Sequence, residues 1–428
     1  MIRRLSAPPF EPLDPLLSQR QSSDSETREA VSAILEEVRS RGDAAVREYT
    51  LRFDGIDLEP SSWSLDSGVW QPALQRIDQK LCAALSRAVD RVRAFHEHQR
   101  EPGFHLTEGD GSLIGTRVTP LDRVGLYVPG GKASYPSSVI MNAVPALVAG
   151  VQEIIAVVPP TGATDAVLAA CALSGVTRIF RVGGAQAIAA LAYGTATIPR
   201  VDKIVGPGNR WVAEAKRQVV GEVGIDMIAG PTELLIIADS TARPARIAAD
   251  LVAQAEHDQD AVCWCVTTDA ALADALPAAL ESALAAAPRA GIAREAIERN
   301  GLVILVPGMR DAIEVANRRA PEHLEIVAEG AERIAASVRH AGAIFLGDDT
   351  PEPVGDYIAG PSHVLPTGGT ARYASPLGVY DFVKRTSIIR YTRARLASDA
   401  EAIIALAEAE GLSGHAQAIR VRLSQENQ

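Results

Sequence analysis

The sequence is poor in several features that mark whole classes of protein. It has four cysteines in 428 residues, and none of them forms a C-x-x-C pair. Such sparse cysteines argue against a disulfide framework, so we expect reduced thiols. Lys and Arg form no basic block, and the formal net charge is −11. Nucleic acid and anionic membranes both require a basic footprint, so neither is an expected partner.

Long apolar runs and targeting signals are missing too. No hydrophobic stretch approaches the roughly 20 residues that cross a bilayer. The first residues, "MIRRLSAPPFEPLD", start with positive charge but have no apolar core behind it, unlike a secretory signal. Hydrophobic residues make up 47% and charged residues 22%, an ordinary globular balance. We therefore expect an intracellular, cytoplasmic protein.

The apolar pattern predicts an α/β protein. Residues 24–100 read as helices, and from about residue 123 short apolar strands alternate with alanine-rich helices. "RVGLYVPGG" and "EIIAVVPP" belong to a first set of strands, and "ELLIIADS" and "AVCWCVTTD" open a second. Alternation of this kind indicates right-handed βαβ units with parallel strands. We predict two doubly wound, Rossmann-like parallel-sheet domains with small N-terminal and C-terminal extensions.

The boundaries of these parts can be estimated. Residues 1–23 form the N-terminal extension, and 127–233 form the α/β domain with the glycine-rich turns. We expect 24–126 to join 234–377 in the other α/β domain, because the second set of strands needs helices on both faces. Residues 378–428 read as a C-terminal arm.

Glycines follow directly after three strands of the first set, in "YVPGG", "VGGAQA" and "VGPGNR". Ligands of parallel sheets bind outside the carboxyl ends of the strands, and glycine lets the backbone approach a ligand. The dinucleotide pattern G-x-G-x-x-G is absent, so ordinary βα turns remain the alternative. The side chains that could face a cofactor there are Tyr127, Gln186 and Asn209.

Two pairs of polar residues are candidate metal ligands or proton carriers. "LVAQAEHD" places Gln254 and His257 three residues apart on a helix, and both imidazole and amide oxygen can bind a metal. The alternative for His257 is a helix-end imidazole bonded to a carbonyl. "GDYIAGPSHVLPT" holds Asp356 and His363 in a stretch that we predict to be a loop.

The remaining histidines are less informative. Glu410 and His415 lie near a helix end in "AEAEGLSGH", where a solvated end is the alternative. His96, His98 and His105 stand among charged residues, and we expect all three to be solvated.

The stretch "RRAPEHLEI" (318–326) carries a carboxylate beside an imidazole. Pro321 disfavours the α conformation at Ala320 and should end the preceding helix there. Glu322 and His323 then stand at a loop-to-strand junction, either as surface residues or as two proton carriers.

Taken in order, these motifs resemble the histidinol dehydrogenase family. "IDMIAGPTELLIIAD" (225–239) is similar to the signature of that family, and "LVAQAEHD", "RRAPEHLEI", "GDYIAGPSHVLPTGG" and "EGLSGH" follow in the family's order. The resemblance runs from about residue 24 to the C-terminus. Thr232 stands where the family more often has serine, and it keeps the hydroxyl.

The resemblance implies an NAD-dependent, zinc-dependent oxidation of L-histidinol to L-histidine through L-histidinal, the last steps of histidine biosynthesis. The enzyme would be an intertwined homodimer whose active sites are shared between subunits. Neutral His323 would take the alcohol proton, and Glu322 would deprotonate the water that adds to the aldehyde. The resemblance implies that one Zn²⁺ per subunit is bound by Gln254, His257, Asp356 and His415, with His415 coming from the partner subunit. It implies that the substrate contacts the same four residues and also Thr232, His323, His363 and Glu410. It implies that NAD contacts Tyr127, Gln186 and Asn209.

Three alternatives stay open at this point. A dehydrogenase on the same scaffold could act on another amino alcohol or a sulfonated diol. A zinc hydrolase is a second alternative, although H-E-x-x-H is absent and hydrolysis has no use for two βαβ domains. A non-catalytic nucleotide-binding module is the third, and failure to reduce NAD⁺ with any alcohol would support it.

Overall fold

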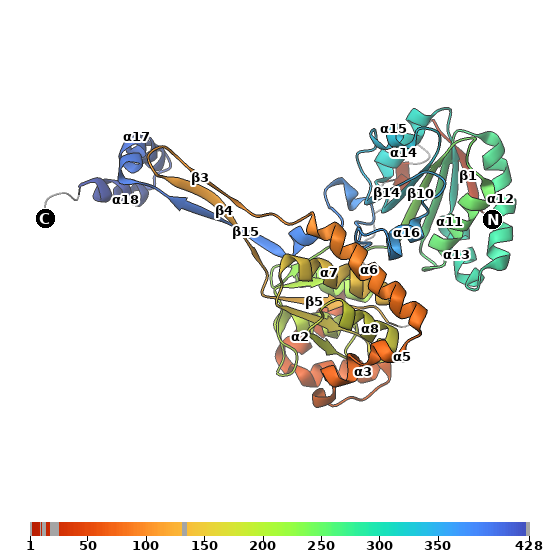
Figure 1. Cartoon of the computed structure of the whole chain (residues 1–428), viewed down its shortest axis with the longest axis horizontal. Helices are drawn as coiled ribbons and strands as arrows, with labels where there is room; N and C mark the ends of the chain where they lie inside the picture. The colour runs from red at the N-terminus through yellow and green to blue at the C-terminus, as the bar shows by residue number, and fades with distance from the viewer. Residues whose placement is uncertain (1, 9, 11–13, 18–24, 131–134, 425–428) are drawn as a thin grey trace. The chain divides into compact units, whose positions relative to one another are not determined.

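The structure is a computed structural model that describes residues 2–8, 10, 14–17, 25–130 and 135–424. The chain divides into two compact units, one of Met1–Gln99 with Leu121–Phe382 and the other of Arg100–Pro120 with Val383–Gln428. The larger unit holds two mostly parallel sheets covered by helices, so the predicted α/β class is confirmed (Figure 1).

The first sheet is built from the first predicted set of strands. In spatial order its strands are β2 (Ser64–Leu65), β7 (Arg178–Phe180), β6 (Glu153–Val157), β5 (Arg123–Tyr127), β8 (Lys203–Val205) and β9 (Gly224–Ile225). All neighbours are parallel except β2 and β7. One face packs on α6 (Gln79–Glu97), α7 (Pro136–Ala149) and α8 (Asp165–Leu173), and the other on α2 (Ser25–Arg41), α3 (Asp43–Asp54), α9 (Gly184–Tyr193) and α10 (Arg210–Gln218).

The second sheet repeats this strand order. Its strands are β1 (Arg3–Ser6), β12 (Leu302–Leu305), β11 (Val262–Thr267), β10 (Glu233–Ala238), β13 (His323–Val327) and β14 (Ala343–Leu346), all parallel. One face packs on α11 (Pro244–Ala255), α12 (Ala270–Ala286) and α13 (Ala290–Asn300), and the other on α1 (Asp14–Leu17), α14 (Met309–Arg319) and α15 (Ala331–Ala335).

The continuous apolar run of β10 follows from this layering. Leu234 and Ile236 belong to the core on one face, and Leu235 and Ile237 to the core on the other. A strand between two helical layers buries both of its faces, so it has no polar alternation.

The expected grouping of the N-terminal half was wrong in two respects. Residues 24–126 were expected to share a core with 234–377, but α2, α3 and α6 pack on the first sheet and β5 is a central strand of it. In the part of the chain that the structure describes, the second sheet is covered on both faces by its own helices. The predicted N-terminal extension also contributes a strand, because β1 pairs with β12 at the edge of the second sheet.

The smaller unit contains more than the predicted C-terminal arm. Strands β15 (Val383–Arg390), β4 (Leu113–Pro120) and β3 (Phe104–Thr107) form an antiparallel sheet in that order, followed along the chain by α17 (Arg393–Ala409) and α18 (Ser413–Ser424). Residues 100–120 therefore belong with the arm. Among the described helices of the whole chain, none is long and apolar enough to cross a membrane.

A buried ion pair stands where the chain leaves the first sheet for the second. The Lys216 ammonium pairs with Asp226, and their side chains are only 2% and 0% exposed. Lys216 also donates to the carbonyl of Gly206 at 3.0 Å, and Asp226 accepts from the Gly206 N–H at 2.8 Å. Gly206 has φ +108°, and a Cβ there would lie 2.3 Å from the carbonyl oxygen of Tyr127. The pair thus holds the glycine turn after β8 against the start of the linker 226–232.

Candidate functional site

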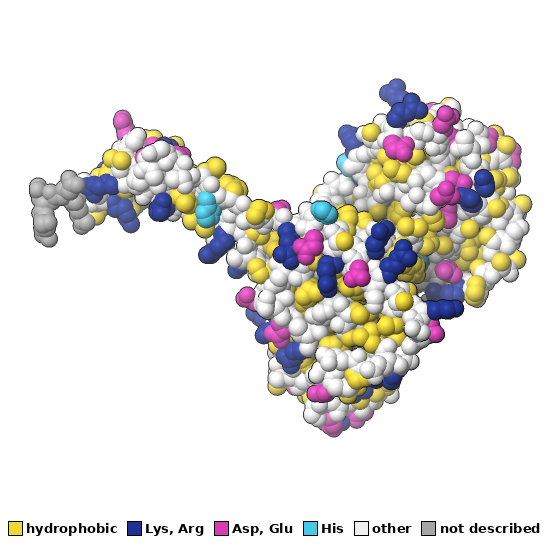
Figure 2. Space-filling view, in the orientation of Figure 1, with side chains coloured by type: hydrophobic (Ala, Val, Ile, Leu, Met, Phe, Trp, Pro, Cys, Tyr) yellow, Lys and Arg dark blue, Asp and Glu magenta, His cyan; other side chains and the backbone are white. Residues whose placement is uncertain are grey.

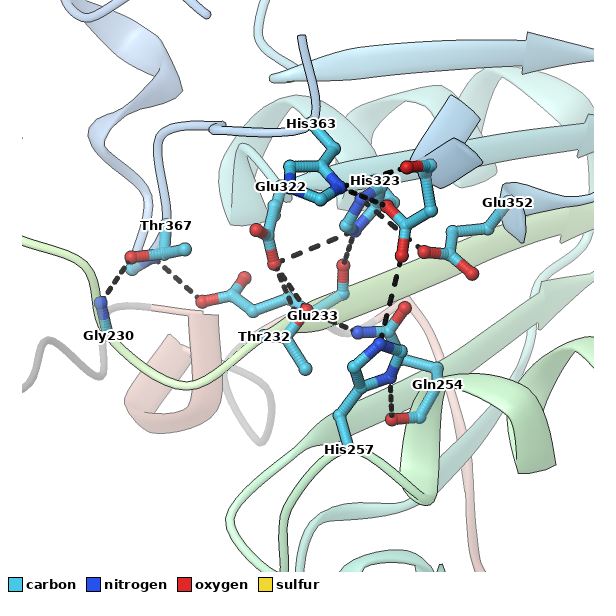
Figure 3. A network of polar contacts seen from close by, with 12 residues as sticks. Gly230, Thr232, Glu233, Gln254, His257, Glu322, His323, Glu352, His363 and Thr367 are labelled. Atoms are coloured by element: carbon cyan, nitrogen blue, oxygen red, sulfur yellow. Dashed lines mark hydrogen bonds and ion pairs between the residues drawn. The ribbon is translucent and has the colours of Figure 1, made fainter. Parts of the chain in front are cut away.

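Polar side chains converge at the amino ends of β10 and β13, which are neighbours in the second sheet (Figure 3). Thr232 directly precedes β10, and Glu322 directly precedes β13. Helix α11 runs back against the strands, so its last turn brings Gln254 to the same edge. The carboxyl-end rule that we applied to the glycine turns does not hold for this network. The reason is that two strand starts, one helix end and the incoming linker all meet at the amino edge.

The chain turns sharply just before the Glu322–His323 pair. Helix α14 ends at Arg319, and Ala320 caps it with φ 51° and ψ 61°, in the left-handed region. Ala320 is the one non-glycine residue with positive φ in the described part of the chain. This conformation is costly for alanine, and it redirects the chain through Pro321 into β13. The helix end predicted from Pro321 is confirmed.

The carboxyl group of Glu322 is buried and hydrogen-bonded on one oxygen. Its Oε2 accepts from the Thr232 hydroxyl at 2.7 Å and from the Glu233 N–H at 2.8 Å. Burial raises the pKa of Glu322 to about 8, although both hydrogen bonds act to lower it. A carboxyl group with such a pKa is a stronger base, once ionised, than an exposed one.

The imidazole of His323 is buried and held in one tautomer. Its Nδ1 lies 3.1 Å from the carbonyl oxygen of Glu233. A carbonyl only accepts, so Nδ1 carries the proton and Nε2 keeps its lone pair. Nε2 is buried and has no hydrogen-bond partner among the residues that the structure describes. Burial lowers the pKa of His323 to about 4, which keeps the ring neutral at pH 7. His323 is therefore a neutral base with a free nitrogen.

The donor atoms expected to hold a metal lie together beside this pair. His257 Nε2 is 3.7 Å from Asp356 Oδ2, and His257 Nδ1 is 3.2 Å from the Gln254 carbonyl oxygen. The side-chain Nε2 of Gln254 donates to the Thr232 hydroxyl, whereas its Oε1 is buried and without a partner in the described part of the chain. An orphaned amide oxygen, an imidazole and a carboxylate form a donor set that suits Zn²⁺.

The charges in this group fit a cation. Burial alone would raise the pKa of Asp356, but His257 and His363 hold it well below the ordinary value. His363 Nδ1 lies 3.6 Å from Asp356 Oδ1. The carboxylate of Asp356 is therefore ionised at neutral pH. Asp356 lies in a short helix, α16 (Glu352–Tyr357), so the loop predicted for it was wrong.

Glu352 was missed by the sequence analysis. It begins α16, is 1% exposed, and its Oε1 lies 3.8 Å from His323 Nε2. Donor atoms of His323, Glu352 and Asp356 all lie within 4.8 Å of one another, a group that could hold a metal ion. Burial, and then the Asp356 charge, raise the pKa of Glu352. The spacing of Glu352 and Asp356, four residues apart, was the available signal.

The residues expected to contact NAD lie at the carboxyl ends of the first sheet. The Tyr127 hydroxyl accepts from the Gly184 N–H at 3.2 Å, and burial raises the pKa of Tyr127 to about 12. Gln186 follows on α9, and both of its amide atoms are buried without a partner among the described residues. Asn209 is exposed and caps α10 through its Oδ1, which accepts from two backbone N–H groups.

The remaining expected residues separate between the two units. His363 belongs to the network in Figure 3. Glu410 caps the end of α17 and His415 lies in α18, so both belong to the smaller unit. His98 and His105 are exposed as predicted, but the prediction for His96 was wrong: it is fully buried and its Nδ1 lies 2.8 Å from the Val92 carbonyl oxygen.

Comparison with known proteins shows which family the chain belongs to. The family model described as histidinol dehydrogenase matches residues 17–423. The chain is 51% identical over 414 residues to a histidinol dehydrogenase of Pseudomonas putida, covering 96% of this chain and 94% of the relative. It is 49% identical over 400 residues to that of Oceanobacillus iheyensis, covering 93% of each.

A solved structure has the same fold over almost the whole chain. The crystal structure of histidinol dehydrogenase from Elizabethkingia anophelis superimposes with a TM-score of 0.92 at 33% identity, covering 99% of this chain and 98% of the other. The ordered motifs, the two repeated sheets and these matches lead to one conclusion: the chain belongs to the histidinol dehydrogenase family.

Proposed function

We propose that the chain oxidises L-histidinol to L-histidine through L-histidinal, using two molecules of NAD⁺ and one Zn²⁺ per subunit, as the last steps of histidine biosynthesis. Family membership supports an oxidoreductase acting on histidinol. The observation that carries the finer proposal is the neutral His323, with a free Nε2, beside Glu322 and the Gln254–His257–Asp356 donors.

His323 supplies the base for the alcohol. Oxidation of an alcohol removes a hydride from carbon and a proton from oxygen, so an unprotonated base must stand at the hydroxyl group. His323 Nε2 meets that need, because Nδ1–H is engaged with the Glu233 carbonyl. When Nε2 takes the proton, the nearby Glu352 and Asp356 carboxyl groups face the imidazolium that forms.

Glu322 supplies the base for the second oxidation. Water must add to the aldehyde before a second hydride can leave, and the water must lose a proton as it adds. The Oε2 of Glu322 is engaged by Thr232 and Glu233, which leaves Oε1 for the water. Thr232 provides this hydroxyl anchor as serine would, and it is itself fixed by the Gln254 amide.

Gln254, His257 and Asp356 would hold the zinc ion, with His415 of the partner subunit as the fourth ligand. Zinc supplies, when bound, a Lewis acid that orders the imidazole and amine of the substrate. The three residues of this chain set its position relative to His323, since Gln254 is tied through Thr232 to Glu322. A tethered aldehyde would then remain between the two oxidations.

Tyr127, Gln186 and Asn209 would line the NAD site. NAD⁺ supplies a hydride acceptor in each step. The buried amide of Gln186, which lacks partners in the described chain, is the observation that supports a polar ligand there. Its neighbour Gly184 has φ +67° and opens the helix α9, so backbone N–H groups face the same end of the sheet.

Replacing His257 by alanine should remove the metal. The variant loses the imidazole and leaves Gln254 and Asp356 as the only ligands from its own chain, so zinc content should fall well below one ion per subunit. Elemental analysis of dialysed protein measures this directly, with His340→Ala as the matched control in the same part of the chain. Full zinc occupancy in His257→Ala would contradict the assigned donor set.

The proposed active site is shared between two subunits. The smaller unit carries Glu410 and His415, and it exposes large apolar side chains (Figure 2) that a partner subunit could cover. Among them are Phe104, Leu106, Ile389 and Leu406, at 55%, 61%, 69% and 67% exposure. Apolar surface of this kind is typical of an obligate interface.

Mixing two inactive variants tests this sharing. If His415 acts in the partner's site, His415→Ala and Glu322→Ala homodimers should each fail to convert histidinol fully to histidine, which is the activity measured here. After subunit exchange, hybrid dimers contain one site with both groups intact, so activity should return to roughly a quarter of wild type for random pairing. Exchange is followed with differently tagged subunits. No recovery despite demonstrated exchange would mean that each site is built within one chain.

A further inference from the structure

We propose that Arg319 and Glu233 are positioning residues that align the acid–base pair, an inference that rests on the proposed roles of Glu322 and His323. Neither residue is expected to touch the substrate or a cofactor. Their effect would pass through the backbone of one residue, Glu233, to both members of the pair.

The backbone of Glu233 contacts both reacting side chains. Its N–H donates to Glu322 Oε2 at 2.8 Å, and its carbonyl oxygen lies 3.1 Å from His323 Nδ1. The first bond orients the carboxyl group, and the second selects the imidazole tautomer that leaves Nε2 free. A displacement of this residue would therefore disturb both groups together.

The side chain of Glu233 anchors that backbone from the opposite direction. Glu233 Oε1 lies 3.0 Å from Arg319 Nη2 and accepts from the Gly368 N–H at 2.8 Å. The side chains of Arg319 and Glu233 are only 6% and 4% exposed. A buried carboxylate without its cation is strongly destabilised, so the position of Glu233 depends on Arg319.

Arg319 is in turn fixed on two sides. Its Nη1 donates to the Leu16 carbonyl at 3.1 Å, and its guanidinium lies over the Trp264 ring at 5.1 Å from the centroid. Arg319 ends α14, three residues before Glu322. These contacts form a closed ring. Arg319 binds the Glu233 side chain, and the Glu233 backbone binds Glu322 and His323. The chain from Glu322 back to Arg319 completes the ring. A planar guanidinium can satisfy these directions together, whereas a lysine ammonium cannot.

The test compares Arg319→Met, Arg319→Lys and the double variant Glu233→Gln with Arg319→Met. A misplacement of about 1 Å at a reacting group can cost roughly 10²-fold in rate. For Arg319→Met we expect the kcat per zinc-loaded site to fall by about that factor. The KM for histidinol and the zinc content should stay within about twofold, because the metal donors are not in the ring. The kcat of Arg319→Lys should lie between those of Arg319→Met and the wild type. The double variant removes both charges, so its kcat should be at least about tenfold higher than that of Arg319→Met.

The matched control is Arg294→Met, which breaks the exposed pair with Glu281 at 2.8 Å on the same sheet's helices. This variant should keep wild-type kcat. If Arg319→Met does not fold, the kcat of Arg319→Lys and of the double variant are compared with that of the wild type instead.

A second readout is independent of the reaction. In ¹⁵N NMR of the histidine rings, assigned with His323→Asn, wild-type His323 should show a single Nδ1–H tautomer, and Arg319→Lys or Arg319→Met should show a mixture. A single unchanged tautomer together with wild-type kcat in Arg319→Met would overturn the proposal. A wild-type protein that does not oxidise histidinol would instead refute the proposed function, and the tautomer comparison would still decide the positioning role.

Discussion

His323→Asn should lose the oxidation of histidinol by roughly 10²–10⁴-fold, the usual contribution of a general base. The asparagine amide can still donate to the Glu233 carbonyl, which His323 contacts through Nδ1 at 3.1 Å. It has no group at the position of Nε2, so the surroundings are retained while the base is removed. The measurement is NADH formation from L-histidinol and, separately, from L-histidinal, at equal zinc content.

His340→Asn is the control, because His340 belongs to the same part of the chain but not to the network. It should retain wild-type rates. If His323→Asn oxidised histidinol at a rate near that of wild type, the base would have to be another group, and Glu352 would be the first to examine.

Glu322→Gln should separate the two oxidations. The amide is close in shape to the carboxyl group and keeps an acceptor for the Thr232 hydroxyl and the Glu233 N–H. Histidinol oxidation should stay within about tenfold of wild type, since His323 serves that step. Histidinal oxidation should fall by roughly 10²–10⁴-fold, because the amide cannot take a proton from water.

This separation is measured by supplying each substrate alone and by trapping the aldehyde released from Glu322→Gln. Thr232→Ser is the conservative control, since it keeps the hydroxyl that anchors Glu322. An equal loss of both oxidations in Glu322→Gln would mean that the carboxylate acts in the first step as well, or that it mainly orients His323.

The sequence predicted the strands well because each is recognisable on its own. The run "ELLIIA" of β10 is apolar throughout, and the strand is buried on both faces as such a run requires. The same pattern could not say which sheet the helices of residues 25–97 would cover. An apolar stripe such as that of Val31, Leu35 and Val38 shows that a helix has a buried face, but not what lies against it.

The candidate site was predictable where it consists of residues with rare chemistry in recognisable motifs. Glu322, His323, Gln254, His257 and Asp356 were expected together, and the structure brings them into one network.

Buried charges were the part that the sequence did not predict. From the sequence alone, Glu352 and Arg319 look like ordinary surface residues, and His96 stands among charged neighbours. All three are buried in the structure. Burial of a polar group depends on which groups meet it in space, and these can be far away in sequence: Glu233 and Arg319 are separated by 86 positions.

Counting the NADH released per histidinol is the first test of the proposed two-step oxidation at one zinc site. The purified protein is given limiting L-histidinol and excess NAD⁺, and the NADH released is measured before and after removal of the metal by a chelator and return of Zn²⁺. We predict two NADH per histidinol, lost on chelation and restored by zinc. One NADH per histidinol, or none from folded and zinc-loaded protein, would rule out the two-step oxidation.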